Sequence, residues 1–250
     1  MSAIATSPLN RRVRFYEASA GKKVVMAVTG VALFGYVIGH LLGNLQIFEG
    51  PDALNSYAHF LHSHEGALWV ARVGLLAAVA LHIVASVQLW VLNQKARPIA
   101  YVRKDNVPAS YAARTMKWSG PIIAAFVIFH VLHLTTGNIV PLQSAPADSP
   151  DAYDNVIIGF QQHPAIAIFY IIAIVLLSMH LYHGLWSMFQ SVGISHPRYT
   201  PKLKRGAAIL AILIAIGYIS IPVACMTHIL SPEAGTAHTG KVDNRYAARR

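Results

Sequence analysis

The stretch VGLLAAVALHIVASVQLWVL, Val73–Leu92, contains no Asp, Glu, Lys or Arg and carries one histidine, His82, near its middle. A helix needs about 20 residues to cross the roughly 30 Å of hydrocarbon in a bilayer. Lipid offers no hydrogen-bond partner to an unpaired backbone, and the apolar residues do not alternate with polar ones, so a helix is favoured over a barrel strand. The stretch therefore predicts a membrane-spanning helix with an ionisable side chain at depth.

Four other stretches are free of charged residues over a similar length, and 12% of the 250 residues are charged whereas 55% are apolar. Soluble domains carry roughly twice that charged fraction. The sequence predicts an all-α integral membrane protein whose five transmembrane helices form one domain, residues 24–230, between a basic N-terminal segment, 1–23, and a polar tail, 231–250. The other predicted spans are Val24–Leu45, Trp118–Leu134, Ile166–Phe189 and Ala207–Leu230.

The net charge of +10 is distributed unevenly along the chain. The N-terminal segment and the second and fourth connecting loops are basic, whereas the first and third loops are acidic and hold no Lys or Arg apart from Arg72 at a span border. Because cytoplasmic loops are enriched in Lys and Arg, this pattern predicts a cytoplasmic N-terminus and, after five crossings, an external C-terminus. The positive charge therefore marks topology and gives no support to nucleic-acid binding.

Histidines lie at depth in four of the five predicted spans. Ionisable residues inside a bilayer are rare, face the bundle interior and are functional candidates. One such histidine is as often a hydrogen-bonding residue between helices as a ligand, but one on each of four helices favours cofactor ligation. Neutral imidazole can ligate iron through one ring nitrogen and donate from the other. The histidines concerned are His40, His82, His130, His133 and His180, with His183 about one turn beyond.

The depths of these histidines, at 1.5 Å of rise per residue, fall at two levels. Those of the first and third spans lie toward the outside, and those of the second and fourth lie toward the cytoplasm. This arrangement fits two haems stacked across the membrane, each held between two histidines. The outer level pairs His40 with His130 or His133, and the inner level pairs His82 with His180 or His183.

An internal repeat distinguishes between His130 and His133, which depth alone does not separate. The first span reads Thr29-Gly30 and then His40, and the third reads Ser119-Gly120 and then His130, with the same ten-residue interval from Gly to His. Glycine lets a flat porphyrin approach the backbone closely, although glycine is also common in transmembrane helices for other reasons. The repeat predicts that His130 is the partner of His40.

Five short motifs in this order and spacing resemble the cytochrome b membrane-anchor subunit of succinate:quinone oxidoreductases, of the single-chain, five-helix, dihaem type. The resemblance covers residues 11–230. The motifs are Gly39-His40, LNSYAHF at Leu54–Phe60, Leu81-His82, Phe129-His130, and His180 followed by GLWS at Gly184–Ser187.

The resemblance implies a haem-binding bundle built from the first four spans. His40 and His130 would ligate an outer haem b, and His82 and His180 would ligate an inner haem b. It also implies an enzyme complex in a bacterial cytoplasmic membrane, in which this chain is the quinone-reactive subunit and menaquinone the substrate. FAD would lie on a flavoprotein partner that handles succinate and fumarate, and iron–sulfur clusters on a second partner. The basic cytoplasmic segments would dock these partners, unless they serve only to set topology.

Polar residues gather where the first external loop meets the second span, and quinone chemistry requires groups that move protons. Glu65 and His59 are the predicted catalytic residues at a quinone and proton site, with His62 and His64 beside them. A solvated loop would carry the same external histidines. The neighbouring Arg72 could extend to a lipid headgroup instead.

Three alternatives keep the same spans. The cytochrome b anchor of a formate dehydrogenase or a hydrogenase also uses intramembrane histidine pairs. A metal-ion transporter would bind zinc or copper in passage, but such sites usually add carboxylates or thiols. Here no Asp or Glu lies in a predicted span, and Cys225 is the only cysteine. In a cofactor-free anchor the histidines would only bridge helices. A reduced-minus-oxidised absorbance spectrum separates these classes.

Overall fold

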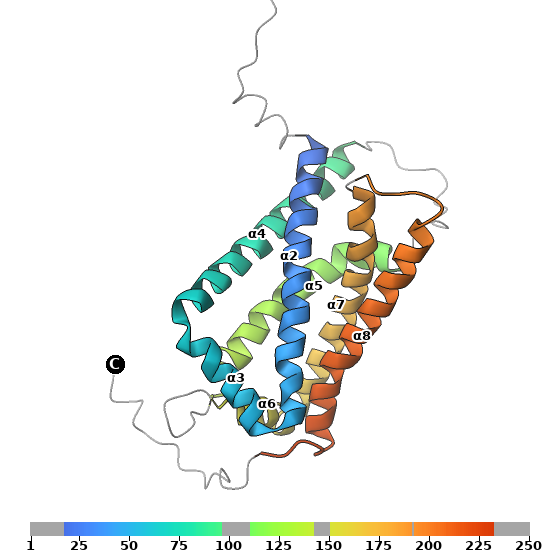
Figure 1. The fold of residues 1–250 in the computed structure, drawn as a ribbon. Coiled ribbons are helices and arrows are strands. Elements are labelled where there is room, and N and C mark those ends of the chain that lie inside the picture. The colour runs from blue at the N-terminus through green and yellow to red at the C-terminus, as the bar shows by residue number, and fades with distance from the viewer. Residues whose placement is uncertain (1–17, 97–110, 143–150, 192, 233–250) are drawn as a thin grey trace, which may run out of the picture.

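The computed structural model describes residues 18–96, 111–142, 151–191 and 193–232, and in these ranges the chain is built from helices (Figure 1). Most of the predicted N-terminal segment and most of the C-terminal tail therefore lie outside the described residues. The elements in chain order are α2 (Ser19–Leu45), the 3-10 turn η1 (Gln46–Glu49), α3 (Pro51–Ser63), α4 (Glu65–Lys95), α5 (Tyr111–Leu134), α6 (Ala152–Gln161), α7 (Pro164–Ser191) and α8 (Thr200–Met226).

Five of these helices are long and apolar enough to cross a membrane, which confirms the predicted number of spans and describes a multi-pass membrane protein. The helices extend beyond the charge-free stretches, most clearly in α4, which begins at Glu65 rather than at Val73. By contrast, α8, the last of the five spanning helices, ends at Met226, so the prediction that this span continues to Leu230 is wrong. The backbone at His228 turns to a positive φ of 58°, which breaks the helix.

Each of the two acidic connections contains a helix among its described residues, which corrects the prediction of plain loops there. Pro51 stands in the first turn of α3, where its missing N–H costs nothing, after Gly50 with a φ of 109°. Asp151 caps α6 by accepting from the backbone N–H of Asp154 at 3.0 Å. Asn55 joins the two helices, because its amide donates to Asp151 and its carbonyl accepts from the N–H of Tyr153.

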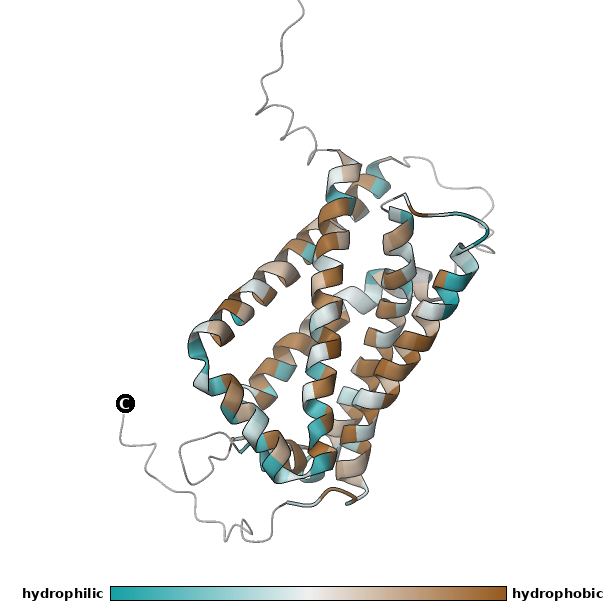
Figure 2. Ribbon diagram, viewed as in Figure 1, coloured by the Kyte–Doolittle hydropathy of each residue, from teal (hydrophilic) through white to brown (hydrophobic). Residues whose placement is uncertain are grey.

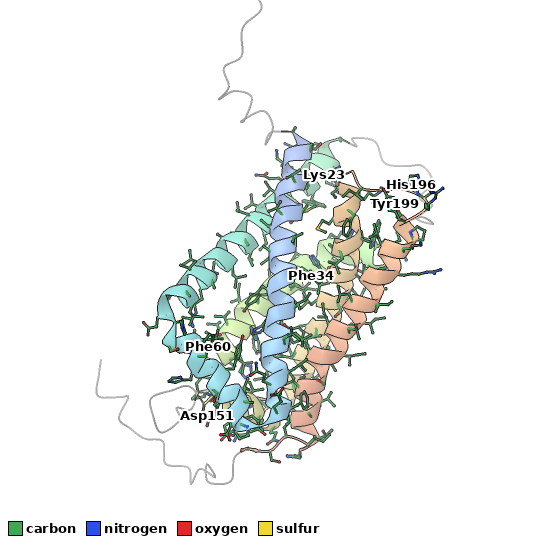
Figure 3. All side chains as sticks on the ribbon, in the orientation of Figure 1. Lys23, Phe34, Phe60, Asp151, His196 and Tyr199 are labelled. Carbon is green, nitrogen blue, oxygen red and sulfur yellow. The ribbon has the colours of Figure 1, made fainter. Side chains whose placement is uncertain are left out.

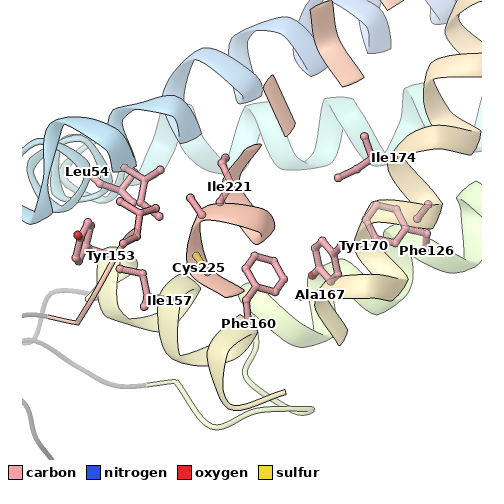
Figure 4. Packing of buried hydrophobic residues seen from close by; sticks show 14 residues of the cluster. Leu54, Phe126, Tyr153, Ile157, Phe160, Ala167, Tyr170, Ile174, Ile221 and Cys225 are labelled. Atoms are coloured by element: carbon pink, nitrogen blue, oxygen red, sulfur yellow. The ribbon is translucent and has the colours of Figure 1, made fainter. Parts of the chain in front are cut away.

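The long helices pack as two pairs with a fifth helix beside them. α2 lies along α4, α5 lies along α7, and α8 packs against α7. The buried core lies where α6, α7 and α8 meet, and Figure 4 shows Ile157, Phe160 and Cys225 converging there. The long helices are mostly hydrophobic along their length (Figure 2), and many of their large hydrophobic side chains are exposed, as expected for a surface covered by lipid.

Charge separates along the bundle. Lys23 lies at one end together with His196 and Tyr199, and Asp151 lies at the other (Figure 3). We call the first the basic end, formed by the start of α2, the end of α4 and the start of α8, and the second the acidic end, formed by η1, α3 and the start of α6. The segregation agrees with the alternating charge of the loops. Several basic residues of the predicted cytoplasmic segments lie outside the described residues. They include Arg11, Arg12, Arg14, Arg97, Arg103 and Lys104.

Candidate functional site

Inside the bundle, four histidines form two pairs, and the two rings of each pair face one another. The ring centres of His40 on α2 and His130 on α5 are 5.7 Å apart, and the rings are nearly perpendicular at 83°. Those of His82 on α4 and His180 on α7 are 6.4 Å apart at 61°. Four helices thus supply one histidine each, and each pair joins helices that are distant in the sequence.

The two pairs lie at different levels along α2. His40 is on this helix, whereas the hydroxyl of Thr29, 11 residues earlier, contacts His82. At 1.5 Å of rise per residue, the levels are roughly 16 Å apart. The His40–His130 pair is the one nearer the acidic end, which matches the predicted two-level arrangement.

His82 is oriented by a hydroxyl from the neighbouring helix. Oγ1 of Thr29 is 3.1 Å from Nδ1 of His82, and it donates its own proton to the carbonyl of Val25 at 2.8 Å. The proton of the hydroxyl is therefore committed, so the oxygen accepts from the imidazole N–H. This bond selects the tautomer with the proton on Nδ1 and leaves Nε2 with a free lone pair.

His180 has the equivalent contact with α5. Oγ of Ser119 is 3.4 Å from Nδ1 of His180 and 3.4 Å from the carbonyl of Met116, to which it donates. Ser119 is 98% buried and stands 11 residues before His130, just as Thr29 stands 11 residues before His40. The sequence repeat thus has a structural meaning: α2 and α5 each give a hydroxyl to one level and a histidine to the other.

His130 is held by a phenol. The hydroxyl of Tyr170 on α7 lies 3.2 Å from Nδ1 of His130 and 2.9 Å from Nδ1 of His133. Tyr170 is buried among the rings of Phe126 and Phe160, whose centres are 5.0 and 4.9 Å from its own. No motif in the sequence pointed to this residue. The one available signal was a hydroxyl-bearing side chain within a predicted span, a feature that Ser178 and Tyr182 of the same span share.

His40 has a different environment from its partner. Tyr36 stacks on its ring at 5.3 Å, and the ring of Tyr218 is 6.2 Å away. The amide nitrogen of Asn44 lies 3.3 Å from Nδ1 and donates to the backbone carbonyl of His40 at 2.7 Å. Unlike the other three histidines, His40 therefore has no hydroxyl beside Nδ1 among the described residues.

The geometry of both pairs is compatible with a haem held between two histidines. Metal–imidazole bonds are about 2 Å long, so two imidazoles on opposite sides of one metal ion have ring centres roughly 6 Å apart. The observed separations of 5.7 and 6.4 Å lie on either side of this value. A ligating histidine also donates its second ring N–H to an acceptor. Hydroxyl oxygens next to His82, His130 and His180 meet that requirement.

His133 and His183 stand outside the two pairs. His133 is fully buried against α6, where a Cβ built on Gly159 would lie 3.0 Å from its Nε2. Among the described residues this nitrogen has no hydrogen-bond partner, and the backbone of Gly159 lies close to it. His130, as the repeat predicts, is the residue that faces His40. On α7, Nδ1 of His183 and Nε1 of Trp186 are likewise buried without a hydrogen-bond partner in the part of the chain that the structure describes.

The predicted quinone residues are not brought together. His59 is exposed on α3 and Glu65 is exposed as the first residue of α4. Ring nitrogens of His62 and His64 bond backbone carbonyls of their own helical turns, and the Arg72 guanidinium lies 5.2 Å from the ring centre of Trp69. The described residues form no hydrogen bond or ion pair between His59 and Glu65, and their role stays a prediction.

Comparisons with known proteins identify no relative of this chain. No protein-family model, curated protein or solved structure matches the chain. In the part of the chain that the structure describes, no group of three or more His, Cys, Asp or Glu is placed to hold a metal ion. The chain is a multi-pass helical membrane protein with four half-buried histidines paired at two levels inside its bundle.

Proposed function

We propose that the chain is the membrane-anchoring cytochrome b subunit of a succinate:quinone oxidoreductase, passing electrons between an iron–sulfur subunit and membrane quinone by way of two b haems. The pairing of His40 with His130 and of His82 with His180 is the observation that carries this proposal. Ionisable side chains inside a bilayer are energetically costly and are therefore functional candidates. Ligation of two haem irons would account for four such histidines on four helices.

The chain's own residues would hold and orient the two groups. His40 and His130 would ligate one haem through ring nitrogens, and His82 and His180 the other. Thr29 and Ser119 would keep Nδ1 of His82 and of His180 protonated, which would leave the Nε2 lone pair of each ring free to ligate iron. Haem b supplies one-electron redox chemistry when bound, and the apolar surroundings help to set its potential.

The basic end would dock the partner subunits. Lys23, Lys95 and Lys202 are exposed there, at the ends of three different helices. A flavoprotein with FAD and an iron–sulfur subunit are the proposed partners, and the docking side would be the cytoplasmic face of a bacterial membrane. Menaquinone is the proposed substrate, and His59 and Glu65 remain the candidates for its proton chemistry.

A reduced-minus-oxidised absorbance spectrum of the purified full chain tests the proposal directly. We expect a b-type band and two haems per chain. Absence of that band would overturn the proposal and favour a cofactor-free anchor or a metal-ion transporter. Metal analysis of the intact complex then decides between cytochrome families. A flavin-containing partner supports the succinate type, whereas molybdenum or nickel would indicate a formate dehydrogenase or a hydrogenase.

A further inference from the structure

Tyr170 has a hydroxyl whose contacts are not explained by the packing of its ring. Its ring is part of the aromatic core, but its hydroxyl lies between two imidazole nitrogens, Nδ1 of His130 and Nδ1 of His133. Tyr170 is 5% exposed and His133 is fully buried. Because unpaired buried polar groups are costly, all three side chains depend on this short chain of hydrogen bonds.

The single proton of the Tyr170 hydroxyl limits the directions that these two hydrogen bonds can take. With one proton, the hydroxyl can donate to only one of the two imidazoles, and its oxygen can accept from the other. If Tyr170 donated to His130, the proton of His130 would sit on Nε2 and block ligation. If it accepts from His130, then Nδ1 of His130 is the donor, its Nε2 is free, and the phenol proton goes to His133 at the shorter distance of 2.9 Å.

We propose that Tyr170 is a positioning residue of the His40–His130 site, and that it sets the redox potential of the group bound there by accepting the Nδ1 proton of His130 while it donates to His133. This inference rests on the proposed function. A hydrogen-bond acceptor behind a ligating imidazole raises the basicity of that ligand. A more basic ligand stabilises the oxidised iron, so the acceptor lowers the potential.

His133 completes the device without being a ligand. Hydrogen bonds in a chain polarise one another, so a phenol that donates to His133 is a better acceptor for His130. The position of His133 against Gly159 fixes its ring, since a Cβ there would lie 3.0 Å from Nε2. His133 is therefore linked to His130 through the hydroxyl of Tyr170.

The test is a redox titration of the b-type absorbance in the full chain, comparing wild type with Tyr170→Phe. The change removes one hydroxyl and keeps the ring that packs on Phe126 and Phe160. We expect the midpoint potential of one haem to rise and that of the other to stay unchanged. The haem that remains in His82→Ala identifies the component belonging to His40 and His130.

Tyr218→Phe is the matched control. Its ring also lies near this pair, 6.2 Å from His40, but its hydroxyl donates to the backbone carbonyl of Val37 at 2.7 Å. We expect a much smaller shift in this variant. His133→Leu removes the acceptor of the phenol proton and should move the same component as Tyr170→Phe, in the same direction but by less.

The outcomes separate the inference from the proposed function. A wild-type chain without b-type haem overturns the proposed function. Two b-type components that Tyr170→Phe leaves unchanged, shifts equally, or shifts no more than Tyr218→Phe does, overturn the inference alone. If Tyr170→Phe does not bind haem, the midpoint potential of His133→Leu is the deciding measurement. An unchanged potential in that variant overturns the proposed role of the hydrogen bonds among His130, Tyr170 and His133.

Discussion

The two histidine pairs have similar separations but different surroundings. The pair of His82 and His180 is held by two aliphatic hydroxyls, one from each neighbouring helix, so both of its histidines are oriented in the same way. In the pair of His40 and His130, one histidine is oriented by Tyr170, and the other is stacked on Tyr36. One repeated helix pattern therefore supports two electrostatic environments, and we expect two haems of different potential.

Removing a ligand should break the comparison most strongly. We expect His82→Ala to lose one of the two haems and to keep the other, because the His40–His130 pair is roughly 16 Å away along α2. The ratio of haem to protein, measured on purified chain, should fall by about half. Loss of both haems, or of neither, would contradict the assignment of separate sites.

Removing an orienting hydroxyl should weaken one site only. In Thr29→Val the side chain keeps its shape, but Nδ1 of His82 loses the acceptor at 3.1 Å. Such changes next to a metal ligand typically cost about 10- to 100-fold in affinity. We therefore expect weaker haem retention at the His82–His180 site, measured by competition with a haem-binding protein. Thr29→Ser, which retains the hydroxyl, should restore wild-type retention.

Ser119→Ala tests the same feature on the other side of that pair. The contact between Oγ of Ser119 and Nδ1 of His180 is longer, at 3.4 Å, so the bond is weaker. We expect an effect in the same direction as Thr29→Val but smaller when both are measured in parallel. An effect larger than that of Thr29→Val would show that the longer contact is the one that matters.

His183→Ala should have the smallest effect. His183 lies less than a turn from His180, but its ring contacts Trp186, with centres 5.4 Å apart, and it has no ring contact with a histidine of another described helix. We expect both haems to remain bound, with an unchanged ratio of haem to protein. Loss of the haem of the His82–His180 pair would make His183 a ligand and would require a different pairing.

The sequence predicted the five spans and the pairing of His40 with His130, but for different reasons, whereas depth left both His180 and His183 open as partners of His82. A run without charged residues such as Val73–Leu92 predicts a span because lipid tolerates little else. Depth gave the level of each histidine but not its direction around the helix, so His130 and His133 were separated only by the repeat. The helices α3 and α6 were missed because their residues are more polar and the predicted spans ended before them.

The contacts of Tyr170 were out of reach for a related reason. Which residues a hydroxyl meets depends on the rotation of α7 relative to α5, and an apolar span without a clear polar face does not record that rotation. Thr29 and Ser119 were visible as parts of a repeat, yet their partners were found only in the packed bundle. Short hydrogen bonds between helices are thus the least predictable part of the site.

The burial of Cys225 makes the chain suited to site-specific labelling. The thiol is 0% exposed and is the chain's one cysteine. Because thiol reagents require access to the sulfur, the native residue should stay silent toward a polar maleimide. A cysteine introduced at Lys23 would then be the one reactive site, and one introduced at Asp52 would report on the opposite end. Labelling of intact cells and of broken membranes would assign each end of the bundle to its side of the membrane.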